Sequence, residues 1–117
     1  MDDTDTPEAG RRLAEEYLRL VEAGDDTAAA DLIAGVTDVR AMAFLGAGLT
    51  ALTRTSARQL SPAQRAQANG RHMRLIAARD AARRDPTGLR SWLEKTAAEA
   101  VFVQQMLATA RARAASA

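Results

Sequence analysis

The sequence lacks cysteine and has little aromatic content. Its 117 residues include one tryptophan, one tyrosine and two phenylalanines. Without cysteine, the chain can form no disulfide, no thiolate nucleophile and no cysteine-ligated metal site. This fits a reducing compartment, and we predict a cytoplasmic location. The longest nearly apolar stretch, residues 41–52, is much shorter than the roughly 20 residues that span a bilayer, so we predict no membrane partner.

Catalytic patterns are scarce as well. His72 is the only histidine, and it lies close to Arg71 and Arg74, which disfavour its protonated form. Helix capping explains the acidic pair Asp25–Asp26 better than metal binding does, because a divalent cation needs several converging oxygens. No nucleophile motif or phosphate-binding glycine loop occurs. We therefore predict no catalytic residue, no metal and no cofactor, and we expect that the protein is not an enzyme.

Alanine, the strongest helix former, is abundant, and each of the three prolines directly follows a helix-capping residue. Proline favours the first position of a helix, where its missing N–H is not needed. The pairs Thr6–Pro7, Ser61–Pro62 and Asp85–Pro86 therefore predict three helix starts. The expected helices cover about residues 7–23, 62–84 and 86–112.

Weaker signals predict two further helices, over about residues 27–34 and from the Thr37–Asp38 capping signal to about 57. All predicted loops are short, which makes neighbouring helices antiparallel. The predicted fold class is all-α, a four- or five-helix antiparallel bundle. We expect residues 1–117 to form a single domain, with frayed ends at 1–6 and 112–117.

Glycines mark three special places. Gly24 follows the first helix, where a left-handed residue is common. Gly46 and Gly48 lie inside an apolar helical pattern, and we expect them to allow close packing against another helix. Asn69–Gly70 is a weak point in the fourth helix, where a kink or a break is possible.

The last helix has the strongest apolar pattern. From Leu89 to Ala110, apolar or small residues recur at alternating spacings of four and three, which is a heptad seam. Trp92, Phe102 and Met106 add a second apolar flank. We predict that this helix and the third one form the centre of the bundle. We also predict an interface with a second copy or another protein, at Leu89, Trp92, Leu93, Val103, Met106 and Leu107.

The charges are segregated along the chain. Residues 1–38 hold eleven acidic residues and three arginines, whereas residues 39–117 hold thirteen basic residues and four acidic ones. One interpretation is charge matching between these two parts, within one chain or between subunits. The other is contact with a polyanion such as nucleic acid. The candidate residues for that contact are Arg65, Arg71, Arg74, Arg79 and Arg83.

Three functional hypotheses follow. The first is a non-enzymatic protein-interaction or accessory module that is homo-oligomeric or bound to a partner. The second is a small nucleic-acid-associated regulator that uses the arginine-rich fourth helix. The third is a small-ligand-binding helical domain with a pocket around His72 and Trp92.

Overall fold

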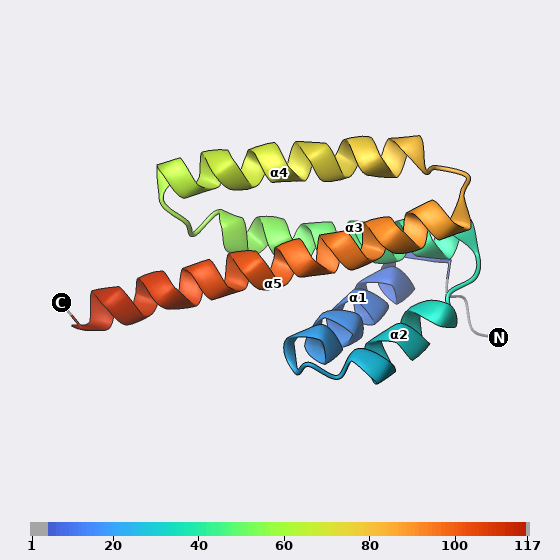
Figure 1. Ribbon diagram of the computed structural model, residues 1–117, viewed down its shortest axis with the longest axis horizontal. Helices are drawn as coiled ribbons and strands as arrows, with labels where there is room; N and C mark the ends of the chain where they lie inside the picture. The colour runs from blue at the N-terminus through green and yellow to red at the C-terminus, as the bar shows by residue number, and fades with distance from the viewer. Residues whose placement is uncertain (1–4, 117) are drawn as a thin grey trace.

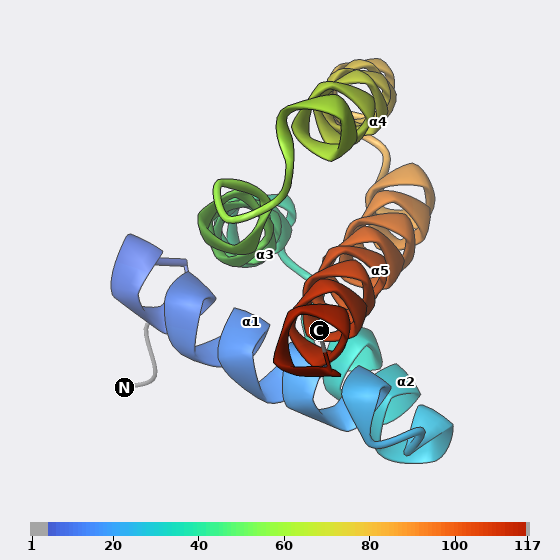
Figure 2. The same ribbon diagram turned by 90° about the vertical axis from the view of Figure 1, so that its left-hand side faces the viewer.

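The computed structural model describes residues 5–116, and this part of the chain forms five α-helices and no strand. Their bounds are α1 Pro7–Glu22, α2 Asp26–Ala34, α3 Val39–Ala57, α4 Pro62–Ala81 and α5 Pro86–Ser116. Helices α3 and α5 run in the same direction along the 51 Å long axis and α4 runs antiparallel to both, while α1 crosses α3 at a wide angle (Figures 1 and 2). The predicted all-α helical bundle is confirmed, with five helices.

Side chains cap four of the five helices where the sequence predicts it; at the start of α3, Asp38 is the N-cap residue but its side chain makes no capping hydrogen bond. The hydroxyl of Thr6 accepts a hydrogen bond from the Ala9 N–H, and that of Ser61 accepts one from the Gln64 N–H. The carboxylate of Asp85 accepts from the Thr87 N–H at the start of α5. Asp25 caps α2 through the Ala28 N–H. These residues therefore already serve the backbone, which would otherwise leave its first N–H groups unpaired.

Helix α3 is the centre of the main core, with α1 on one side and α5 on the other. Gly46 lets the indole of Trp92 lie against α3, because a Cβ there would overlap the ring. Gly10 of α1 brings two helix backbones together: a Cβ on it would lie 2.5 Å from the backbone of Phe44. The predicted close packing at Gly46 and Gly48 is confirmed, since a Cβ on Gly48 would lie 2.8 Å from that of Ala14.

Helix α4 is peripheral. It packs mainly on α5, and its backbone stands apart from α3 (Figure 2). Ala68 is its only buried residue, and it belongs to a smaller second core with Ala57, Leu60, Val103 and Leu107. A helix with so little buried apolar surface adds little to the free energy of unfolding.

Two details differ from the sequence-based expectation. Helix α4 runs without a break through Asn69–Gly70, so the possible interruption there does not occur. Helix α5 continues to Ser116, beyond the predicted end near residue 112, with its last residues exposed. Gly24 has a φ of +73°, as the predicted left-handed residue after α1 requires. Between residues 5 and 116 no helix is long and apolar enough to cross a bilayer.

Candidate functional site

The predicted polyanion contacts lie on α4 or just beyond it, but they are not equivalent. Arg65, Arg74, Arg79 and Arg83 are exposed. Arg71 is different, because it points toward α5 and forms a forked ion pair with Glu99, at 2.8 and 2.9 Å from its Nε to the two carboxylate oxygens. Its guanidinium also stacks over the Phe102 ring, 4.8 Å from the centroid. Arg71 therefore holds α4 on α5, and it is not one of the residues available for contact with a polyanion.

Charge matching within the chain does not occur among residues 5–116. The ion pairs there are Arg19–Glu16, Arg71–Glu99 and Arg79–Asp80, and none joins residues 5–38 to a later segment. The reason is geometric: α4 lies on the opposite side of α3 and α5 from the acidic α1 and α2 (Figure 2). The predicted pairing of the basic helix with the acidic N-terminal region of the same chain is therefore wrong for residues 5–116.

The charges instead separate the molecule into two regions. Residues 54–74 and 99–116, which meet where α3 ends and α4 begins, hold seven arginines and one glutamate. We call this region the basic end. Residues 5–38 hold nine acidic residues and three arginines. Because Arg71 already pairs with the single glutamate, the other arginines of the basic end have no carboxylate on the same region.

Most of the predicted interface residues are already covered by the chain itself. Leu89, Trp92, Leu93, Val103 and Leu107 are buried, since the heptad seam of α5 faces α3 and the second core. In this fold those five side chains are too deeply buried to form an interface with another protein, and only an edge of Trp92, 3% exposed, reaches a cleft between α3 and α4. Met106 is partly exposed, and beside it Phe102 keeps 46% of its surface exposed. The accessible apolar surface of α5 is thus its second flank.

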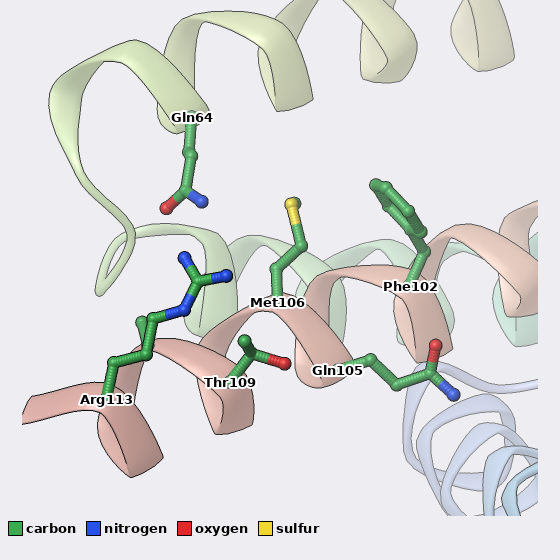
Figure 3. Close-up of a pocket in the computed structure, with 7 residues that line it drawn as sticks. Gln64, Phe102, Gln105, Met106, Thr109 and Arg113 are labelled. Atoms are coloured by element: carbon green, nitrogen blue, oxygen red, sulfur yellow. The ribbon is translucent and has the colours of Figure 1, made fainter. Parts of the chain in front are cut away.

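This flank forms one wall of a groove of about 360 Å³ between α5 and the start of α4 (Figure 3). Phe102 and Met106 point across it toward α4, and Gln64 points back from α4. We call it the end groove; its remaining lining residues are Gln105, Thr109, Ala110 and Arg113. Sequence reasoning missed these four lining residues, three of which are polar. Spacings of three and four along α5 nevertheless continue the Phe102–Met106 flank through Thr109 to Arg113.

A second concavity lies between α3 and α4, with Trp92 of α5 also lining it. This cleft, of about 340 Å³, brings together His72 and Trp92, the two residues around which the sequence suggested a pocket. Sequence reasoning missed Thr50, because a single threonine in an apolar helix does not indicate a binding role. We call this space the α3–α4 cleft; its lining is Ala47, Thr50, Ala51, His72, Leu75, Ile76, Arg79 and Trp92.

The electrostatic environment of His72 is positive. Partial burial, together with the charges of Arg54 and Arg79, lowers the pKa of His72 below its ordinary value of 6.5. Glu99 of α5 lines, together with His72, the small gap next to the cleft, and it is already paired with Arg71. His72 is therefore held neutral near pH 7, in a cleft with no carboxylate among its lining residues.

This environment predicts a pH dependence that NMR can measure. We expect the single imidazole to titrate with a midpoint below 6.5. Because the unfolded chain then binds the proton more readily, the contribution of His72 to stability is complete above pH 6.5. It is lost as the pH falls from there through the lower folded-state pKa. The variant His72→Gln should show a flatter dependence of unfolding free energy on pH between about 7 and 5. A midpoint at or above 6.5 would contradict the packing of α4 described above.

Among residues 5–116, no three histidine, aspartate or glutamate side chains gather in a way that could hold a metal ion. Comparisons with protein-family models, with curated proteins and with solved structures found no match. The two concave surfaces and the separation of charge are therefore the features of the molecule that point to a function.

Proposed function

We propose that this protein is a protein-interaction module whose end groove binds an acidic amphipathic helix of another protein. The observation that carries the proposal is the accessible Phe102–Met106 flank inside a region of seven arginines and one glutamate. An amphipathic helix places apolar anchors at intervals of three and four residues into such a groove. Glutamates beside those anchors would meet the arginines, and complementary charge selects the partner and speeds its approach.

A second copy of the chain fits this groove less well. Two copies meeting through their end grooves would bring two basic ends together, and like charges in contact are costly. The acidic region of a second copy has the right charge. However, within residues 5–116 the exposed large apolar side chains are Met73 and Phe102, so α1 and α2 offer no anchor for the groove. We therefore favour another protein over self-association.

The test uses a synthetic helix with leucine at every third or fourth position and glutamate on both flanks. We expect it to bind the full chain in a fluorescence anisotropy titration, and the same helix with lysine in place of glutamate to bind at least about tenfold more weakly. The double substitution of Phe102 and Met106 by alanine should also weaken binding by at least about tenfold, because buried anchor residues carry most of the energy of an interface.

The matched control is Met73→Ala. Met73 is the other exposed large apolar residue and lies outside the groove, so its loss should leave the affinity unchanged. Equal binding of the glutamate and lysine helices would overturn the proposal. Two other outcomes would replace it. Salt-sensitive binding of DNA or RNA that is lost with Arg65 and Arg74 would favour the nucleic-acid regulator. Dimerisation in light scattering that is lost with Phe102→Ala would favour self-association.

A further inference from the structure

The α3–α4 cleft is on a different surface from the end groove, and its lining has a distinct chemistry. Its floor is apolar, with Trp92 held against α3 by Gly46, and with Leu75 and Ile76 on the α4 side. Ala47 and Ala51 of α3 are exposed into it and leave it open, since their side chains are too small to reach α4. A volume of about 340 Å³ lies within the range of roughly 300–1,000 Å³ that is typical of small-molecule sites.

The titratable groups that line the cleft carry positive charge or can acquire it. Arg79 and His72 line it from α4, and the adjoining gap is lined by Arg54 of α3 and by Glu99 of α5, whose charge Arg71 already pairs. Within residues 5–116 Arg79 forms an ion pair only with its neighbour Asp80, at 3.1 Å, and this pair is weak because the two side chains are 45% and 61% exposed. No aspartate or glutamate is among the lining residues of the cleft. An anion entering the cleft would therefore meet favourable charge without having to displace a buried carboxylate.

We propose that the α3–α4 cleft binds a small organic anion with a flat apolar body. The body would lie on Trp92, Leu75 and Ile76, and the anionic group would face Arg79 and His72. The threonine hydroxyl of Thr50, on the opposite wall, can donate a hydrogen bond to the same group. An inorganic anion would gain nothing from the apolar floor, and a neutral aromatic compound would gain no attraction between opposite charges from Arg79 or from His72 when it is protonated.

The cleft exists because α4 is peripheral. In the middle of α4, Ala68 and the Arg71–Glu99 pair hold it on α5. Toward its end, small α3 residues such as Ala47 and Ala51 lie opposite it, so the space between the two helices stays open. A ligand that fills this space would bury apolar surface of both helices and add contacts between them. Such a ligand binds only the folded chain, so it should raise the melting temperature.

The probe for the test is 2-naphthoate, with neutral 2-naphthamide and cationic 2-naphthylmethylammonium as matched comparisons. We expect calorimetry on the full chain to give an affinity for 2-naphthoate at least about tenfold higher than for either comparison. Arg79→Gln and His72→Gln should each weaken 2-naphthoate binding several-fold. In NMR, the midpoint of the His72 titration should rise when 2-naphthoate binds, because the anion offsets the repulsion from Arg54 and Arg79.

A substitution that fills the cleft is the sharpest control. Ala47→Leu should abolish 2-naphthoate binding, whereas Ala43→Leu, one turn earlier on α3 and exposed but outside the cleft, should leave it unchanged. Equal affinity for 2-naphthoate and 2-naphthamide would overturn the inference, as would undiminished binding to Ala47→Leu. Neither result affects the end groove: the acidic helix should bind Ala47→Leu with unchanged affinity, so the two proposals can fail separately.

Discussion

The variant Gly46→Ala is expected to unfold with a free energy about 2–3 kcal/mol lower than the native sequence. The added Cβ would overlap the Trp92 ring, and moving the buried ring aside would break its packing in the main core. Overpacking of this kind costs about 1–3 kcal/mol or more. Urea denaturation followed by far-ultraviolet circular dichroism measures the loss, and Trp92, the only tryptophan, should change its fluorescence as the ring is displaced.

The matched control is Gly70→Ala in α4. Nothing lies within 4 Å of a Cβ at that position, so the only effect is the greater helix propensity of alanine. We expect Gly70→Ala to stabilise the protein by about 0.5–1 kcal/mol. The same chemical change should thus have opposite signs at the two positions. If Gly46→Ala also stabilised the protein, α3 and α5 could not pack in the described register.

The second large effect is expected at Leu45. Its side chain is fully buried on α3, in the core between α1 and α5. Leu45→Ala removes buried methyl groups and leaves a cavity that close-packed neighbours cannot fill, which costs about 2–5 kcal/mol. The midpoint of urea unfolding should fall with little change in its denaturant dependence, since the fold and the surface exposed on unfolding remain similar.

Leu75→Ala is the comparison for Leu45→Ala. Leu75 is only partly buried, on the peripheral α4, so the same substitution should cost clearly less. Equal losses at the two positions would mean that α4 is as integral to the core as α3, and the α3–α4 cleft would then lose its structural basis.

Local chemistry explains which parts of the fold could be predicted. Capping residues and prolines act on the first turn of a helix, so Thr6–Pro7 and Ser61–Pro62 located helix starts to the residue. Gly46 indicated a close approach, because a glycine in a helix interior costs about 1 kcal/mol relative to alanine. The partner at that approach, Trp92, is 46 positions away and could not be named from local pattern.

Properties that depend on distant segments were predicted less well. A heptad seam shows that a helix buries one face, but it does not show whether α3 of the same chain or a partner covers that face. This is why Leu93 and Val103 were assigned to an interface and turned out to be core residues. Similarly, no local pattern links Arg71 to Glu99, so the sequence does not distinguish the paired Arg71 from the exposed arginines of α4.

For the candidate sites, residue types were more informative than positions. The sequence suggested a pocket around His72 and Trp92, and the structure places both at one cleft. The rest of that lining is alanine, threonine and aliphatic residues, which occur throughout the sequence and mark no particular place. The end groove was only partly predictable, through Phe102 and Met106, because its shape depends on where α4 begins relative to α5.

The separation of charge has a consequence for motion in solution. With a formal net charge of only +1, the protein would barely migrate in a uniform field. Its acidic α1–α2 region and its basic end nevertheless give it an electric dipole moment. The electric field of a charged partner exerts a torque on this dipole before the two molecules come into contact. An acidic partner would therefore rotate the molecule during approach so that the basic end arrives first. Added salt should slow the productive encounters more than it speeds dissociation.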